Sequence, residues 1–521
     1  MTEPTLGAFA GGYSASLETY LAEVRDLYLA DSTPWVIGYS GGKDSSAVVQ
    51  LVWLALAGIP ADQRAKPIHV ITTDTMVENP VVSAWVNSSL SRMRDQAREL
   101  GLPIHAHLLT PNVTETFWVN LIGRGYPAPR PKFRWCTERL KIKPSTRFIE
   151  QAINENGEVI LLLGARKSES AARAAAFKAR ESLNVRDRIA RHPKMQNALV
   201  YTPIEAWDTD DVWLFLMRTQ NPWGHSNKDL MALYRGASDD NECPVVVDTS
   251  TPSCGNSRFG CWTCTLVDQD KSMAAMIQND HEKEWMLPLL NVRNQLDFRG
   301  DEAREREAGN RDFRRMGGFL SFYETDDGQV KIVRGPYVQR ARADWLRLVL
   351  KAQETVRSHP LAPDHVRDLE LISFEELEEI RRLWVEEKRE VEDLVPAIYE
   401  EVTGRAYPGE PRRRPVGVGD EVLETLREVV EGNDIAYETV RNLLTAEWQY
   451  RSMGSRRGLF KDLEKILDTG AFVDEEQAIE HVERRARRRR ETHEVRAEQI
   501  YKVSEGVAAT DATDNEGVES C

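Results

Sequence analysis

The sequence predicts an α/β protein with a parallel β-sheet, followed by a cysteine-rich lobe and a mainly helical C-terminal region. In the first half of the chain, short apolar runs alternate with longer helix-forming stretches, which is typical of parallel strands joined by crossover helices. From residue 276 the chain becomes charged and largely helical. The strands are expected at 35–39, 68–73, 104–109 and 159–163.

The first predicted strand ends in a glycine turn, because the apolar run 35–39 is followed directly by Ser40-Gly41-Gly42. Residues 45–56 are apolar and favour the helix after this turn, and residues 81–100 favour a second helix. A strand, a turn and a helix in this order place the carboxyl end of the strand beside the start of the helix.

Changes in composition divide the chain. Glycine, proline, serine and cysteine dominate the stretch after residue 235, and a proline-rich break follows residue 405. The predicted parts are an N-terminal helical segment 1–30, an α/β domain 31–235, a cysteine-rich lobe 236–275, a mainly helical domain 276–405 with a small hairpin near 317–335, a helical C-terminal domain 416–502 and a disordered acidic tail 503–521.

The overall charge limits the partners that the chain is expected to bind unaided. The 521 residues carry 68 Lys and Arg against 83 Asp and Glu, a net charge of −15. Nucleic-acid binders usually carry a basic excess, so contact with DNA or RNA requires local basic patches or partner proteins. No apolar run approaches the roughly 18 residues of a membrane span, and the N-terminus has no signal-peptide pattern. A cytoplasmic location without membrane association is expected.

Seven residues between the first strand and the first helix form a candidate phosphate-binding loop. Glycines allow backbone N–H groups to approach an anion, the helix N-terminus adds partial positive charge, and serine hydroxyls donate further hydrogen bonds. The spacing differs from that of a Walker A loop. The predicted loop residues are Ser40, Gly41, Gly42, Lys43, Asp44, Ser45 and Ser46.

Four of the six cysteines cluster in the cysteine-rich lobe, and in a reducing compartment such clustering indicates metal binding rather than disulfides. The Cys261-Trp262-Thr263-Cys264 turn presents two thiolates to one metal, and Cys243 and Cys254 could complete a set of four ligands. On geometry alone, four thiolates suit zinc and a [4Fe–4S] cluster equally.

A fifth cysteine, Cys136, lies among basic residues that are expected to lower the pKa of its thiol. A thiolate is the form that persulfide chemistry requires. A buried, inert thiol is the alternative. The basic neighbours are Arg134, Arg139, Lys141 and Lys143.

The loop sequence SGGKDSS resembles the pyrophosphate loop of the N-type ATP pyrophosphatases and their phosphoadenosine phosphosulfate (PAPS) reductase relatives. This resemblance implies a fold of the adenine-nucleotide α-hydrolase type, with ATP bound and cleaved between its α- and β-phosphates. It also places Asp74 near the nucleotide, although an Asp that caps the next helix is an alternative. Residues 164–173 resemble a G-x-R-x-x-E-S-x-x-R element of this group, which implies a site role for Gly164 and Arg166; taken alone, their charges also suit a solvated helix face.

The cysteine motif is similar to that of another member of the group. Residues 260–265 look like the second half of the cluster motif of adenylylsulfate reductases, and this favours [4Fe–4S] over zinc. Those reductases carry a Cys-Cys pair where this chain has Cys136-Thr137, so five cysteines compete for four cluster positions. We expect Cys136 to carry sulfur and Cys243, Cys254, Cys261 and Cys264 to hold the cluster. The reverse, with Cys136 as a ligand and Cys243 or Cys254 spare, stays open.

Four segments together resemble the DndC family, the sulfurtransferases of bacterial DNA phosphorothioation systems: WVIGYSGGKDSSAVVQLVW, HVITTDTMVENPVV, FRWCTERLKIKP and GCWTCTLV. The SspD proteins of single-strand modification systems are similar. The resemblance implies ATP-dependent sulfur transfer to DNA, with Mg²⁺ on the pyrophosphate, a cysteine desulfurase as sulfur donor and other Dnd proteins as partners. The catalytic residues that it implies are Lys43, Asp44, Cys136 and Arg166.

Two other functions remain open at this stage. One is thiolation of tRNA by the same ATP chemistry. The other is a nucleotide-binding interaction subunit of a defence complex, in which the cluster is purely structural.

Overall fold

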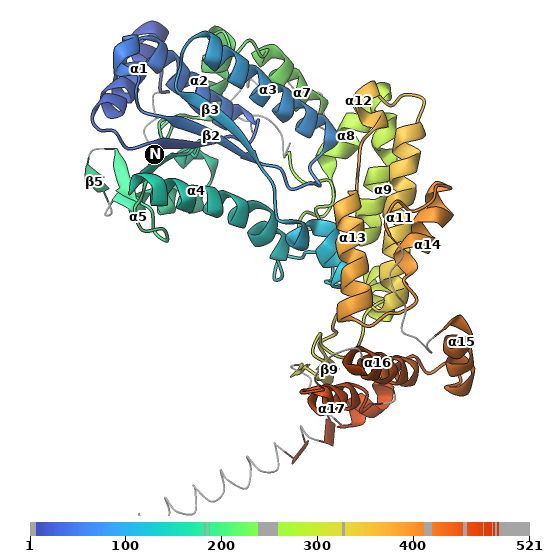
Figure 1. The fold of residues 1–521 in the computed structure, drawn as a ribbon. Helices are drawn as coiled ribbons and strands as arrows, with labels where there is room; N and C mark the ends of the chain where they lie inside the picture. The colour runs from blue at the N-terminus through green and yellow to red at the C-terminus, as the bar shows by residue number, and fades with distance from the viewer. Residues whose placement is uncertain are drawn as a thin grey trace, which may run out of the picture.

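A computed structural model describes residues 7–181, 184–186, 188–237, 259–325, 329–410, 419–451, 456–472, 474–481, 483–484 and 487–488. Figure 1 shows an α/β domain beside a column of helices, with a smaller group of C-terminal helices below that column. The predicted cluster ligands Cys243 and Cys254 and the predicted tail 503–521 lie outside the described residues.

The α/β domain contains a seven-stranded sheet in the order β3-β2-β1-β4-β7-β6-β5. The strands are β1 (Trp35–Gly38), β2 (Ile68–Thr73), β3 (Ile104–Leu109), β4 (Val159–Leu162), β5 (Asn184–Arg186), β6 (Ile189–Arg191) and β7 (Ala198–Tyr201). The pairs from β3 to β7 are parallel, whereas β6 and β5 add antiparallel pairs at one edge. The predicted fold class, an α/β protein with a parallel sheet, is confirmed, and the observed sheet is mostly parallel.

Both faces of the sheet are buried, because alternate side chains of each strand enter different cores. Trp35 and Ile37 of β1 pack into one core, and Val36 between them packs into the other. The first core receives residues of α1 (Tyr13–Leu29), α2 (Lys43–Ala57), α3 (Pro80–Glu99) and α6 (Thr209–Arg218). The second core receives α4 (Lys143–Asn156), which runs along the opposite face in Figure 1.

The predicted strands 68–73 and 104–109 are β2 and β3 with the same bounds, and β1 and β4 are each one residue shorter than predicted. The helix after the glycine turn begins at Lys43, two residues earlier than predicted. The strands β5, β6 and β7 were not predicted. Three residues, as in β5 and β6, show no usable periodicity, whereas β7 was missed although its four buried residues form an apolar run as long as β4. The antiparallel pairs at this edge add to the predicted parallel sheet.

The helical column packs against residues that precede α4. Trp118 donates a hydrogen bond from Nε1 to the carbonyl oxygen of Leu371 at 2.7 Å, and Trp384 donates one to Ile122 at 3.0 Å. The column contains α8 (Lys271–Asn279), α9 (Leu287–Leu296), α10 (Asp301–Gly309), α11 (Gln339–Ser358), α12 (Asp364–Arg367), α13 (Phe374–Arg382) and α14 (Leu394–Thr403).

A hairpin of β8 (Phe322–Glu324) and β9 (Val330–Ile332) lies within the predicted range 317–335. The C-terminal helices are α15 (Asp420–Val429), α16 (Asp434–Arg451) and α17 (Leu459–Thr469). The exact domain boundaries stay predictions. In the part of the chain that the structure describes, no helix has both the length and the apolar character to cross a membrane.

Candidate active site

The predicted phosphate loop connects the end of β1 to the start of α2. Gly41 has a φ of 75°, a conformation that favours glycine, and a Cβ at this position would collide with the Val86 side chain. Trp85 donates from Nε1 to the Gly41 carbonyl oxygen at 3.1 Å. The loop therefore follows a path that is fixed by α3 and open only to glycine.

The serines of the loop mainly hold its shape. Ser45 donates from Oγ to the Gly42 carbonyl oxygen at 3.1 Å and accepts from the Ser40 backbone N–H at 3.2 Å. Ser46 is buried and hydrogen-bonded to Tyr39. Direct contact of Ser45 and Ser46 with phosphate stays a prediction.

Asp44 lies between two cations. Its carboxylate accepts from Arg166 Nε at 2.7 Å and from Lys43 Nζ at 2.9 Å. The Arg166 side chain is only 3% exposed. Gly164 allows this approach, since a Cβ there would lie 3.0 Å from the Asp44 backbone. The structure thus gives Arg166 a role in positioning Asp44, and its contact with the α-phosphate stays a prediction.

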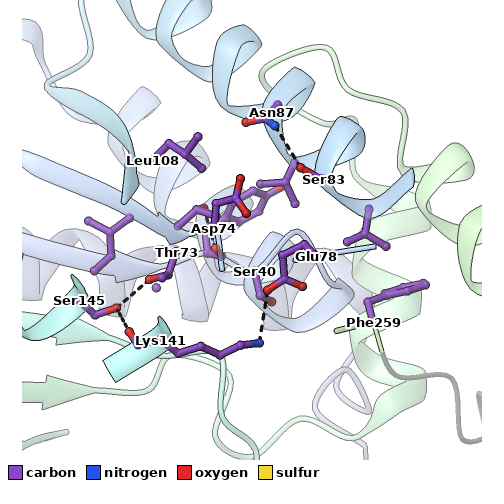
Figure 2. A pocket seen from close by; sticks show the side chains of 16 residues that line it. Ser40, Thr73, Asp74, Glu78, Ser83, Asn87, Leu108, Lys141, Ser145 and Phe259 are labelled. Carbon is purple, nitrogen blue, oxygen red and sulfur yellow. Dashed lines mark hydrogen bonds and ion pairs between the residues drawn. The ribbon is translucent and has the colours of Figure 1, made fainter. Parts of the chain in front are cut away.

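A cavity of about 300 Å³ opens at the carboxyl ends of β1 and β2, the edge where parallel α/β sheets bind ligands. Figure 2 shows Asp74, Glu78 and Lys141 around it. Its lining residues are Gly38, Tyr39, Ser40, Ile71, Thr72, Thr73, Asp74, Glu78, Val82, Ser83, Val86, Asn87, Leu108, Lys141, Ser145 and Phe259. Of the predicted site residues, Ser40 and Asp74 line the cavity.

Asp74 faces the cavity rather than capping a helix. The N-cap of α3 is Asn79, whose side chain accepts from the Val81 N–H at 3.0 Å, so the capping alternative for Asp74 is wrong. Burial raises the pKa of the Asp74 carboxyl, and the nearby Glu78 raises it further, whereas a hydrogen bond from the Met76 N–H opposes both. A cation bound in the cavity would reverse this shift.

The Cys-x-x-Cys turn packs directly on the wall of this cavity. Trp262 donates its backbone N–H to the Val77 carbonyl oxygen at 2.9 Å, and Glu78 pairs with Cys261 in a β-bridge. Thr75 Oγ1 lies 3.3 Å from Cys261 Sγ. The segment that links β2 to α3 therefore contacts the cavity on one side and the cysteines on the other.

Lys141 connects the two sides. It lines the cavity, lies 3.5 Å from Glu78 Oε1 and interacts electrostatically with the thiols of Cys261 and Cys264. Burial lowers the pKa of Lys141, but Cys261 and Glu78 raise it overall. Sequence reasoning treated Lys141 only as a neighbour of Cys136 and missed Glu78. Lys141 follows Cys136 by five residues. In the π-helical turn Thr137–Ile142, residues five apart lie one above the other, so this spacing was the signal that could have placed Lys141 near Cys136.

Cys136 lies near Cys264, and the pKa of its thiol is raised, mainly by burial. The prediction that basic neighbours lower the pKa of the Cys136 thiol is wrong, because two of these neighbours face other groups. Arg139 donates to Tyr126 Oη at 3.2 Å and to Asn120, and Lys143 pairs with Glu115. Lys141 does lower the pKa of Cys136, but less than burial raises it.

Three free thiols, those of Cys136, Cys261 and Cys264, thus belong to one neighbourhood. Burial and Glu78 raise the pKa of Cys261 to about 12, which a bound metal would reverse. Thiolates are the donors that iron–sulfur clusters use, so the chemistry of these residues fits such a group. Among the described residues, no group of three or more His, Cys, Asp or Glu side chains is placed to hold a metal ion.

Comparison with known proteins gives a family match over the α/β domain. Residues 34–267 match the phosphoadenosine phosphosulfate reductase domain, and this similarity supports the predicted superfamily. An uncharacterized protein of Methanocaldococcus jannaschii is 28% identical over 200 residues, which cover 38% of this chain and 35% of that protein. The chain thus matches about a third of the length of this relative. The assignment to DndC stays a prediction.

Solved structures resemble the chain only weakly. The U34-tRNA thiolase NcsA of Methanococcus maripaludis, solved with its [4Fe-4S] cluster, is 13% identical, covers 56% of this chain and 84% of its own, and has a TM-score of 0.26. The FMN adenylyltransferase of Candida glabrata is also 13% identical, covers 43% and 60%, and has a TM-score of 0.25. Likenesses at this level carry no functional argument.

Proposed function

We propose that this protein is an ATP-dependent sulfurtransferase of the DndC type, which adenylylates a DNA backbone phosphate and replaces a non-bridging oxygen with sulfur. One observation carries the proposal. Lys141 lines the cavity at the strand ends and also lies beside the thiols of Cys261 and Cys264. Phosphate chemistry and sulfur chemistry can therefore take place at adjoining positions.

In the first half of the reaction, a non-bridging oxygen of the DNA phosphate attacks the α-phosphorus of ATP. The bond from this phosphorus to the bridging oxygen breaks, and pyrophosphate leaves. The N–H groups at the start of α2 and the Lys43 ammonium stabilise the leaving charge. Asp74 and Glu78 supply carboxylate oxygens, the ligands that Mg²⁺ prefers.

In the second half, the terminal sulfur of a persulfide on Cys136 attacks the activated DNA phosphorus, and AMP leaves with the original oxygen. A thiol reductant then cleaves the remaining S–S bond, so that sulfur stays on the DNA and the two thiol sulfurs form a disulfide. A cysteine desulfurase supplies the persulfide. Cys136 is half-buried, which reduces the access of water to this sulfur.

The proposed cluster ligands are Cys243, Cys254, Cys261 and Cys264. A bound [4Fe–4S] cluster would supply a fixed charged centre beside Lys141. The proposal includes a cytoplasmic location and a complex with the other Dnd proteins of a phosphorothioation-based restriction–modification system.

The first test is pyrophosphate release from ATP by anaerobically purified full-length protein, with desulfurase and DNA present. Lys43→Ala should reduce the rate about 10²- to 10³-fold, the usual effect of removing one stabilising donor. Lys228→Ala, at an exposed lysine of α7 (Asn227–Gly236), is the matched control and should keep the rate. Asp44→Ala is a weaker test, because it also leaves the buried Arg166 without this carboxylate.

Equal rates of pyrophosphate release for Lys43→Ala and wild type would contradict a role of the phosphate loop in the reaction. If pyrophosphate is released but labelled sulfur enters RNA and not DNA, the ATP chemistry stands and the DNA substrate is wrong.

A further inference from the structure

A tight turn at Arg130–Phe133 projects from the segment that leads to Cys136. The backbone N–H of Phe133 donates to the Arg130 carbonyl oxygen at 2.8 Å, and the N–H of Arg130 donates back at 3.3 Å. Pro131 and Lys132 form the exposed tip. Phe133 is 36% exposed, a large value for an aromatic side chain, and Arg134 beside it is exposed as well.

The base of this turn is anchored firmly. Trp135 is buried, stacks on Phe117 with ring centroids 5.4 Å apart, and donates from Nε1 to the Pro127 carbonyl oxygen at 3.0 Å. Thr265, the residue after Cys264, donates from Oγ1 to the Pro129 carbonyl oxygen at 2.5 Å. The turn is therefore held against the cysteine motif.

Two of the three cations of the turn, Lys132 and Arg134, have no acidic partner among the described residues, whereas the third, Arg130, interacts electrostatically with Glu307. Across the described ranges, neither Lys132 nor Arg134 forms an ion pair. This differs from the helical column, where Arg342, Arg381 and other arginines are paired with carboxylates. In a chain with a net charge of −15, a turn with two unneutralised cations is a local site for an anionic partner.

We infer that the turn Arg130–Arg134 is the docking site for an unpaired DNA strand, an inference that rests on the proposed function. Lys132 and Arg134 contact backbone phosphates, and a base stacks on the exposed face of Phe133. Cations interleaved with an aromatic ring form the usual surface for single-stranded nucleic acid. Only Trp135 separates Arg134 from Cys136, so a strand held here brings a phosphate toward the sulfur carrier.

An acidic protein surface, such as that of a sulfur donor, could also contact Lys132 and Arg134. A protein surface of this kind does not need the Phe133 ring, whereas a stacked base contacts that ring directly. A substitution at Phe133 therefore distinguishes a nucleic acid from a protein partner, and the exposed ring favours the nucleic acid.

The test measures anisotropy of a fluorescein-labelled single-stranded DNA oligonucleotide with the full chain, without ATP. Phe133→Ala should weaken binding about 5- to 100-fold through lost stacking. Lys132→Ala with Arg134→Ala should reduce the slope of log affinity against log salt by about 1.4, since about 0.7 is lost per phosphate contact on a single strand.

The control variants remove the same residue types from α17, which Figure 1 shows among the C-terminal helices and apart from the α/β domain. Phe460 there is 85% exposed, and Lys461 and Lys465 are exposed as well. Phe460→Ala and Lys461→Ala with Lys465→Ala should leave affinity and salt slope unchanged. Circular dichroism and ATP affinity verify that all variants are folded.

The inference is overturned if wild type does not bind the strand, if the turn variants bind like wild type, or if duplex DNA or RNA binds more tightly through the same residues. It is also overturned if the turn variants keep DNA affinity but no longer accept sulfur from the desulfurase, because the turn then docks a protein. Pyrophosphate release is recorded on the same samples, so each of these results can occur while the proposed function stands.

Discussion

The α/β domain and the helical column use charged side chains in different ways. In the column, buried cations meet carboxylates directly: the side chains of Arg342 and Glu390 are 3% and 4% exposed and form a two-pronged pair. At the strand ends of the α/β domain, Asp74, Glu78 and Lys141 instead face a cavity. The charges of the column serve the fold, whereas those at the strand ends remain available to a ligand.

The Asp44–Arg166 pair forms an exception within the α/β domain. Arg166 is as buried as Arg342, yet its carboxylate partner belongs to the phosphate loop. This pair combines both uses, because a structural ion pair fixes the start of the helix that is expected to bind phosphate.

The largest effect on stability is expected from breaking a pair in the column. Glu390→Ala leaves the buried Arg342 charge uncompensated and should reduce the free energy of unfolding by about 3–5 kcal/mol. Urea unfolding measures this loss. Pyrophosphate release by the folded fraction should persist, because the pair does not line the cavity.

The matched control for this experiment is Glu401→Ala, which breaks an exposed pair with Arg347. The two side chains are 55% and 37% exposed, so the loss should be about 0–1 kcal/mol. Equal losses for Glu390→Ala and Glu401→Ala would contradict the structural role of buried pairs in the column.

A second effect comes from a buried carboxyl that has no cation among its main contacts. Burial raises the pKa of Glu376 from 4.5 to about 7, although hydrogen bonds from Ser373 and Thr116 oppose it. The folded state therefore keeps a proton that the unfolded state loses above about pH 4.5. The contribution of Glu376 to the free energy of unfolding is therefore complete below pH 4.5. It is lost as the pH rises to about 7, which lowers the free energy of unfolding by roughly 3 kcal/mol.

Glu376→Gln should flatten the dependence of unfolding free energy on pH between about 4.5 and 7. Glu375→Gln, at an exposed neighbour on α13, should keep the wild-type profile. If the unfolding free energies of all three proteins depend on pH in the same way, the pKa of Glu376 does not change on folding, and Glu376 is ionised in the folded state above about pH 4.5.

A smaller effect on stability is expected at the contact behind the phosphate loop. Gly164→Ala places a Cβ 3.0 Å from the backbone of Asp44, and such overpacking costs about 1–3 kcal/mol. The loop should shift and pyrophosphate release should fall. Gly236→Ala, where a Cβ meets no atom within 4 Å, should change neither stability nor rate; a wild-type rate for Gly164→Ala would show that the loop tolerates the shift.

Local sequence patterns were sufficient for the central fold. The apolar runs of β1 to β4 and the glycines after β1 define the sheet and the loop, because both depend on neighbouring residues only. The strands β5 and β6 were missed because three residues are too few to show a pattern, whereas β7 was missed although its apolar run is as long as that of β4.

The composition of the cavity could be predicted only in part, because it depends on contacts between distant segments. Glu78 and Cys261 are separated by 183 positions, and nothing near either residue indicates their pairing. Arg342 and Glu390 are separated by 48 positions, and their pairing is equally invisible in the sequence. The motif located the loop, whereas tertiary packing brought Lys141 to the cavity and paired Arg166 with Asp44.

The segment between β2 and α3 has a thermodynamic consequence. Val77 and Glu78 pair with the cysteine turn, and Glu78 also forms part of the cavity wall. A ligand that displaces this segment changes the cavity and the surroundings of the cysteine thiols together. Reciprocity then requires that the factor by which bound nucleotide alters the affinity of the thiols for a metal equals the factor by which the metal alters the affinity for nucleotide.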